Sequence, residues 1–305
     1  MKRSEFIKSS VLTSLAVAAG TTVSAEKSDS YIAPGKTFNL NYAPHDGMFN
    51  NHAGKNFLDQ IRFMHDRGFR AIEDNGYLNR SVNEQEAIGN LLSKLGMTMG
   101  VFVVDGGDNW KPSLTTGKKE FRDHFIDTCK KSVEASKRCN AKWATVVPGY
   151  YQRDLPMGIQ TANVLESLKR GAEIFEPHGL VMVLEPLSDT PELFLRYSDQ
   201  TYEICKAVDN PSCKILFDIY HMQRNEGNLI KNMERCWDEI PYIQIGDNPG
   251  RNEPTSGEIN YKNIFKFIHQ KGFKGVLGME HGNAKAGKEG ELTLIKAYRD
   301  QDNFL

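Results

Sequence analysis

Four side chains that carry oxygen ligands follow four successive apolar segments in the second half of the chain. They are Glu185 in Val-Leu-Glu-Pro, Asp218 in Leu-Phe-Asp-Ile, Gln244 in Tyr-Ile-Gln-Ile and Glu280 in Gly-Met-Glu-His. A single carboxylate at the end of an apolar segment is explained equally well by a helix cap or a lysine pair. Four such groups in series instead indicate a shared site, because unpaired polar groups are costly to bury. Oxygen ligands suit a hard divalent cation, so we predict bound Mg²⁺ or Mn²⁺, with Co²⁺ also compatible.

Two carboxylates at one metal ion suit proton transfer beside a carbonyl group. The ion polarises a carbonyl and its neighbouring hydroxyl, and a glutamate then removes the acidified proton to give an enediolate. Return of the proton to the neighbouring carbon interconverts an aldose and a ketose. Return to the opposite face of the same carbon epimerises the sugar. Glu185 and Glu280 can serve both outcomes, so the residues alone leave isomerase and epimerase open.

Three further polar residues near these segments are candidates for substrate contacts. His221 follows Asp218 by three residues, which predicts a position on a loop above the metal, where it could bind a substrate hydroxyl. Arg251 follows a Pro-Gly turn, and a guanidinium there would suit a carboxylate or a polyol. Glu226 is a candidate for a supporting or substrate-binding role. His221 and Arg251 also have a simpler interpretation as solvent-facing loop residues.

The candidates are positioned by a regular alternation of strand patterns and helical patterns. The strand patterns cover residues 38–42, 71–73, 98–104, 143–147, 181–185, 214–218, 242–245 and 275–280. The helical patterns cover residues 55–67, 84–95, 119–139, 158–177, 198–208, 228–238, 260–271 and 288–300. Eight such units predict an α/β fold, a single-domain (β/α)8 TIM barrel over residues 37–305. In that fold functional groups lie at the carboxyl ends of the strands, and residues 105–116 are expected to form a loop over the barrel mouth.

The N-terminal segment differs in composition from the rest of the chain. Lys2, Arg3 and Lys8 precede an apolar run over residues 11–20, and small residues follow it up to Ala25. This order is typical of a secretory signal, and the run is too short to cross a membrane. We therefore expect a signal peptide over residues 1–25 and a linker over residues 26–36. Export to the periplasm by a Sec or twin-arginine-like route would leave no membrane span in the mature chain.

The net charge and the cysteine content limit the kinds of binding partner that the sequence predicts. The formal net charge is −1, which favours neither a nucleic acid nor an anionic membrane surface. The five cysteines form no Cys-x-x-Cys pair, so we expect buried free thiols rather than a zinc ribbon or a redox motif. The expected partner is a small-molecule sugar or hydroxy-ketone substrate. Formation of a homo-oligomer stays open.

Two stretches that contain predicted ligands carry further information. They begin Asp218-Ile-Tyr-His-Met-Gln-Arg-Asn-Glu-Gly and Gln244-Ile-Gly-Asp-Asn-Pro-Gly-Arg. Both resemble the hydroxypyruvate isomerase family of the xylose isomerase-like TIM barrels, and the resemblance covers roughly residues 38–300. It implies that the two glutamates are the acid and base and that His221 and Arg251 contact substrate. It implies a metal set of Glu185, Asp218, Gln244 and Glu280.

The chain departs from that family at two loops. The family usually has Glu-Tyr-Lys-Pro after the last strand, whereas this chain has Glu280-His-Gly-Asn, and Lys285 or His281 are candidates to replace the absent lysine. The segment after Glu185 is Pro-Leu-Ser-Asp-Thr-Pro instead of the Asn-rich form that is common in the family. Both changes lie where substrate specificity is set.

Three functions therefore compete. The leading hypothesis is an exported, metal-dependent isomerase or epimerase of a small sugar or hydroxy-ketone. The alternatives are a metal-dependent lyase or hydrolase acting on an oxidised sugar derivative, and a non-catalytic sugar-binding relative that keeps the metal site. A phosphodiesterase of the endonuclease type is disfavoured, because strand patterns two to four end near Glu73, Asp105 and Pro148 with no histidines.

Overall fold

Eight parallel strands form the centre of the protein in the computed structural model, which describes residues 35–305. They are β1 Tyr42–Ala43, β2 Ala71–Ile72, β3 Thr98–Met99, β4 Trp143–Val146, β5 Val181–Leu184, β6 Cys213–Asp218, β7 Tyr242–Gln244 and β8 Val276–Gly278. The expected signal peptide over residues 1–25 lies outside the described residues, as does all but the end of the linker. Export therefore stays a prediction.

The strands close into a ring. Strands β1, β8, β7, β6, β5 and β4 form one parallel sheet, and β2 pairs with β3 in a second. Single bridges join the two sheets. One links His45 to Glu73, just beyond β1 and β2, and the other links Val103, beyond β3, to Thr145 in β4. The predicted TIM barrel is confirmed.

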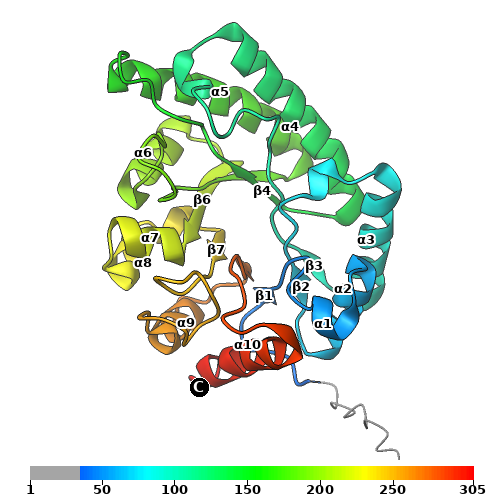
Figure 1. Cartoon of the computed structure of the whole chain (residues 1–305). Coiled ribbons are helices and arrows are strands. Elements are labelled where there is room, and N and C mark those ends of the chain that lie inside the picture. The colour runs from blue at the N-terminus through cyan, green and yellow to red at the C-terminus, as the bar shows by residue number, and fades with distance from the viewer. Residues whose placement is uncertain (1–34) are drawn as a thin grey trace, which may run out of the picture. The chain divides into compact units, whose positions relative to one another are not determined.

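Helices follow the strands and lie outside them (Figure 1). The main ones are α2 Phe57–Asp66, α3 Val82–Leu95, α4 Lys119–Cys139, α5 Met157–Phe175, α6 Ser198–Val208, α8 Leu229–Arg235, α9 Tyr261–Gln270 and α10 Gly287–Gln301. Two short helices, α1 Asn50–Ala53 and α7 Ile219–Asn225, and the 3-10 turns η1 Tyr77–Asn79, η2 Leu114–Thr116, η3 Glu176–His178 and η4 Trp237–Glu239 complete the described chain. The predicted bounds of α4 and α6 agree with the structure.

Several strands are shorter than their apolar patterns, because other hydrogen bonds replace the ladder at their ends. The pattern over residues 38–42 begins too early, since the backbone N–H groups of Asn39 and Leu40 donate to the carboxylate of Asp302 at the end of α10. Beyond β3, the extended chain continues as a bridge, with Val104 N donating to the carbonyl of Thr145.

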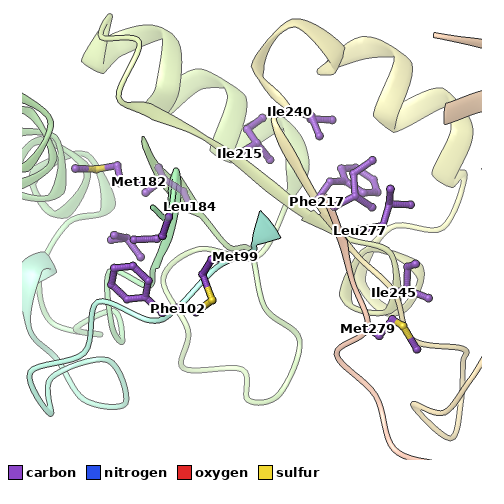
Figure 2. Packing of buried hydrophobic residues seen from close by; sticks show 14 of the residues in the cluster. Met99, Phe102, Met182, Leu184, Ile215, Phe217, Ile240, Ile245, Leu277 and Met279 are labelled. Carbon is purple, nitrogen blue, oxygen red and sulfur yellow. The ribbon is translucent and has the colours of Figure 1, made fainter. Parts of the chain in front are cut away.

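Alternate residues of each strand bury two different apolar surfaces. Met182, Leu184, Ile215 and Phe217 belong to a large cluster that also contains helix residues (Figure 2). The residues between them face the barrel interior with others of their kind: Ala43, Ala71, Val101, Val183, Leu216, Tyr242 and Val276. This interior apolar layer fills the barrel below the strand ends, as TIM barrels require.

Two smaller expectations concern thiols and membranes. All five cysteines are buried free thiols, as predicted. Among the described helices, none combines the length and the apolar composition that crossing a membrane requires.

The contact between α3 and α4 depends on a residue without a side chain. A Cβ atom at Gly89 would lie 1.8 Å from the carbonyl oxygen of Arg138 in α4. We expect Gly89→Ala to lower the free energy of unfolding by about 1–3 kcal/mol, because the two helix backbones must separate. Denaturant unfolding measures the change.

Gly158 is the matched control, since it is also helical and its Cβ would meet no described atom within 4 Å. Gly158→Ala should leave stability unchanged or slightly higher, because alanine favours helix. Equal effects of the two substitutions would contradict close packing at Gly89.

Candidate active site

The candidate site is the layer directly above the apolar interior of the barrel. Along each strand, the residue two positions beyond an interior apolar residue faces the same side. Val183 is followed in this way by Glu185, Leu216 by Asp218, and Tyr242 by Gln244. Asp218 pairs in register with Gln244, and Gln244 pairs with Gly278, two residues before Glu280. The predicted ligands are therefore brought to one rim by strand register.

The carboxylates of that rim converge closely. One atom from each of Glu185, Asp218, His221 and Glu280 lies within 4.8 Å of the others, an arrangement that could hold a metal ion. Within residues 35–305, the buried oxygens Glu185 Oε1 and Gln244 Oε1 have no hydrogen-bond partner. Buried polar atoms usually find a partner, so these two atoms are available to a ligand.

Glu73, at the end of β2, orients the amide of Gln244. Its carboxylate accepts a 2.8 Å hydrogen bond from Gln244 Nε2 and another of 2.8 Å from the hydroxyl of Tyr242. Because the amide nitrogen is used in this way, Gln244 Oε1 is the atom left for a ligand. Gly278 makes room for the buried acid, since a Cβ there would lie 1.7 Å from Glu73 Oε2.

His221 lies in α7, and the prediction of a loop was wrong. Asp218 caps this helix, accepting hydrogen bonds from Tyr220 N at 2.7 Å and His221 N at 3.3 Å. Asp218 thus ends β6 and starts α7, which buries His221 completely. This helix start is hard to recognise in the sequence, because Asp218 also ends a strand and is followed by further apolar residues.

The hydrogen bonds of His221 decide which ring nitrogen faces the site. Ser188 N donates to Nδ1 at 3.1 Å, and a backbone N–H can only donate, so Nδ1 is the acceptor. Burial lowers the pKa of His221, outweighing the Asp218 charge, so the ring is neutral and Nε2 carries its proton. A histidine bound to a metal normally donates from its other nitrogen. His221 Nε2–H, which has no hydrogen-bond partner among residues 35–305, is therefore a donor available at the cavity.

Arg251 covers the carboxylates from the loop after β7. Its Nη2 lies 2.6 Å from Glu280 Oε2 and 3.3 Å from Asp218 Oδ2, and its Nε donates to the carbonyl of Glu280 at 3.2 Å. The guanidinium also lies over the ring of Tyr220, 5.0 Å from its centroid. It places a fixed positive charge beside the three carboxylates and is held on two sides.

Burial raises the pKa of both Glu185 and Glu280. Desolvation, reinforced by the charges of Glu280 and Asp218, raises the pKa of Glu185 well above its ordinary value. Desolvation raises the pKa of Glu280 to about 7 against the opposing effect of Arg251. A carboxyl group with a pKa of about 7, such as Glu280, can hold or release a proton near neutral pH, which general acid–base catalysis requires.

A cavity of about 310 Å³ opens above these groups. Glu185, His221, Arg251 and Glu280 line it. Asp105, Asn109 and Trp110 also line it, which confirms that the segment 105–116 forms a loop over the mouth. Its volume is at the lower end of the roughly 300–1,000 Å³ typical of ligand pockets, so a small molecule fits.

Sequence reasoning missed several residues of the cavity wall, and two of them lie against predicted site residues. Asn75 Nδ2 donates to Glu280 Oε1 at 2.8 Å, and Asp189 lies 3.7 Å from His221 Nε2 and 3.9 Å from Arg251 Nη1. Asn75 follows Glu73 at the end of β2, which was a signal available in the sequence. Asp189 lies on a loop, where spacing carries little information.

Glu226 does not line the cavity, so of the two roles left open by the sequence its contacts favour the supporting one. Its carboxylate accepts hydrogen bonds from the backbone and hydroxyl of Ser198 at the start of α6 and from Asn232 Nδ2. Helix α7 ends just before Glu226, and Gly227 follows in a left-handed conformation. The chain turns there, and the Glu226 side chain contacts α6 and α8. Glu226 therefore supports the helices that surround the site.

Neither candidate for the absent lysine reaches the cavity. His281 is buried against Tyr298, with Nε2 2.7 Å from its hydroxyl, and burial lowers its pKa to about 3. Lys285 lies on the surface 3.4 Å from Glu289, with its side chain 59% exposed.

Comparison with known proteins identifies the family. Residues 61–300 match the family model described as xylose isomerase-like TIM barrel. The chain belongs to this family. This xylose isomerase-like barrel is 30% identical to 2-oxo-tetronate isomerase of Cupriavidus necator over 259 residues, which are 82% of this chain and 95% of the relative. It is 37% identical to hydroxypyruvate isomerase of Escherichia coli over 140 residues, 45% of this chain and 54% of the relative. With isomerases as its relatives, the chain is an enzyme of the isomerase class.

Solved structures share the fold of this xylose isomerase-like barrel. A family 2 AP endonuclease from Brucella melitensis aligns with a TM-score of 0.73 and 22% identity, covering 85% of this chain and 99% of the other. The 3-keto-D-glucoside 4-epimerase of Escherichia coli gives 0.73 and 19%, covering 86% and 99%. A protein named IOLI, with a bound zinc atom, gives 0.67 and 15%, covering 86% and 96%. At these identities the likeness shows the fold alone.

The support of Gln244 can be tested through Tyr242. Tyr242→Phe removes a donor from Glu73 and an acceptor from Val101 N, which lies 3.3 Å from the hydroxyl. We expect a loss of about 1–3 kcal/mol in unfolding free energy, because both groups are buried. Denaturant unfolding of the protein checks it.

The control is Tyr202→Phe, which removes only a 3.4 Å hydrogen bond to Asp238 at an exposed position. It should change stability by less than about 0.5 kcal/mol. A Tyr242→Phe protein as stable as the Tyr202→Phe protein would show that Glu73 does not depend on the tyrosine.

Proposed function

We propose that this protein is a divalent-metal-assisted isomerase or epimerase that moves a proton beside the carbonyl of a small sugar or hydroxy-ketone, using Glu185 and Glu280 as base and acid. One observation carries the proposal. These two carboxyl groups come from different strand ends, line one small cavity, and both have pKa values raised by burial. A non-catalytic sugar-binding protein would need only one of them.

The residues of the rim fit a divalent cation. Glu185, Asp218, Gln244 and Glu280 would hold it, because they offer three carboxylates and an amide oxygen, and two of these oxygens are buried without hydrogen-bond partners among residues 35–305. This all-oxygen set favours Mg²⁺ or Mn²⁺, with Co²⁺ compatible. When bound, such an ion would polarise the substrate carbonyl and its neighbouring hydroxyl.

The side chains around the rim divide the remaining work. One glutamate takes the proton from the carbon beside the carbonyl and becomes a neutral carboxylic acid. A neutral carboxylic acid of the pair, either this one or the other glutamate, then returns a proton to complete the turnover. His221 Nε2–H donates to a substrate oxygen and holds it in place. Arg251 offsets negative charge that develops on the substrate, from its position against Glu280 and Asp218.

The two glutamates should each be indispensable. We expect Glu185→Gln and Glu280→Gln each to lower kcat by about 10²–10⁴-fold, the usual contribution of a general acid or base. The assay is solvent deuterium incorporation into a ketose, followed by NMR with Mn²⁺ or Mg²⁺ present. Glu203→Gln, on the exposed surface of α6, is the control and should keep wild-type turnover. Full activity in both site variants would exclude the two-carboxylate mechanism.

Stabilisation by the metal should depend on pH. Both glutamates have raised pKa values, so the metal-free folded state binds protons more tightly than the unfolded chain. Its unfolding free energy therefore falls as pH rises from the ordinary carboxyl range through about 7. A divalent cation relieves this loss, because it binds the ionised carboxylates.

We accordingly expect MnCl₂ to raise the melting temperature of EDTA-treated protein more at pH 8 than at pH 5.5. An equal or larger shift at pH 5.5 would argue against metal binding by these glutamates. The Asp218→Asn protein, which keeps both glutamates but loses one predicted ligand, should show a smaller shift at either pH.

A further inference from the structure

We infer that the substrate of this site is an uncharged ketose or keto-sugar rather than a keto acid. The inference rests on the proposed function, because it concerns the molecule on which the two glutamates would act. It differs from the named activities of the two curated relatives, since 2-oxo-tetronate and hydroxypyruvate are both carboxylates.

The charge around the cavity is strongly negative. Four carboxyl groups line it, those of Asp105, Glu185, Asp189 and Glu280, and Asp218 lies just beneath. Among the described residues that line the cavity, Arg251 is the single cation. With a divalent ion bound, the ionised groups still sum to −2, and to −1 when one glutamate holds the transferred proton. A carboxylate substrate would therefore enter against repulsion in a site of low dielectric constant.

In the described part of the chain, Nε and Nη2 of Arg251 are already engaged, which leaves Nη1 as its remaining donor for a substrate carboxylate. Its Nη2 is bound by Glu280 and Asp218, its Nε by the Glu280 carbonyl, and its Nη1 faces Asp189 at 3.9 Å. Recognition of a carboxylate by arginine usually needs two parallel N–H donors. Here protein carboxylates already occupy that side of the guanidinium.

Nearby lysines are also committed elsewhere. Lys111, on the loop over the mouth, lies 2.6 Å from Asp108, and Lys285, beyond β8, lies beside Glu289 on the surface. The segment that follows Glu280 instead contains the buried His281, whose Nε2 lies 2.7 Å from the hydroxyl of Tyr298. Neither lysine lines the cavity, so neither is placed to bind the acid group of a substrate.

The remaining polar groups suit hydroxyls. Asn75, Asn79 and Asn109 line the cavity, and Thr145 Oγ1 there is buried with no partner in the described part of the chain. Amides and hydroxyls both donate and accept, as sugar hydroxyls do. Trp110 lies at the mouth with 52% of its surface exposed, where its ring can meet the C–H face of a sugar.

Matched pairs of substrates test the inference directly. Dihydroxyacetone and hydroxypyruvate differ only by a CH₂OH group in place of a carboxylate, and erythrulose and 2-oxo-tetronate form the corresponding four-carbon pair. Solvent deuterium incorporation is followed for each compound with Mn²⁺-loaded protein, and binding is measured by calorimetry. We expect the neutral member of each pair to have the higher kcat/KM, by at least about tenfold. Added salt should raise kcat/KM for the acids alone, since it screens repulsion.

Asp189→Asn adds a readout specific to charge. Removing this carboxylate should raise kcat/KM for the acid relative to its neutral partner severalfold, whereas Asp59→Asn, which loses only a surface pair with Arg62, should leave the ratio unchanged. A higher kcat/KM for the acids in wild-type protein overturns the inference while leaving the proposed function intact. If no compound exchanges deuterium, the proposed function fails, and tighter calorimetric binding of the acids would still overturn the inference.

Discussion

Three carboxylates meet at the top of a barrel whose interior is apolar, and their mutual repulsion is the constraint on which the rest of the site depends. The layer below them, with Val183, Leu216 and Val276, offers no hydrogen bonds to Glu185, Asp218 or Glu280 from its side chains. Ionised carboxylates in such a place need nearby positive charge. Arg251 supplies one charge from the loop after β7, and the proposed divalent ion would supply the rest.

The fold converts this repulsion into a defined geometry. Strand register aligns Asp218 with Gln244, and the N-terminus of α7 holds one oxygen of Asp218 through two backbone N–H groups. Glu73 fixes the amide of Gln244 from below. The acidic surroundings that would favour a cation would also disfavour a substrate with a carboxylate. In the proposed function, catalysis, metal binding and substrate selection all follow from one arrangement of charge.

Much of this was predictable from the sequence. Every second residue of a strand faces the same side of the sheet. Candidate ligands at the ends of the apolar strands were therefore expected to meet at the rim of the barrel. The helix at α7 was missed because Asp218 serves as both ligand candidate and cap. The sequence left the role of Glu226 open, because nearness in sequence to His221 says little about where a side chain beyond a helix end lies. Asp189 was missed because it comes from a loop whose path depends on tertiary packing.

The central claim is that the rim binds one divalent cation through its carboxylates. Calorimetric titration of Mn²⁺ into EDTA-treated protein at pH 8 tests it most directly. The account predicts one ion per chain, with affinity reduced by at least about tenfold in Asp218→Asn, because a charged ligand is replaced by a neutral one. Absence of binding, or binding that Asp218→Asn leaves unchanged, would contradict it.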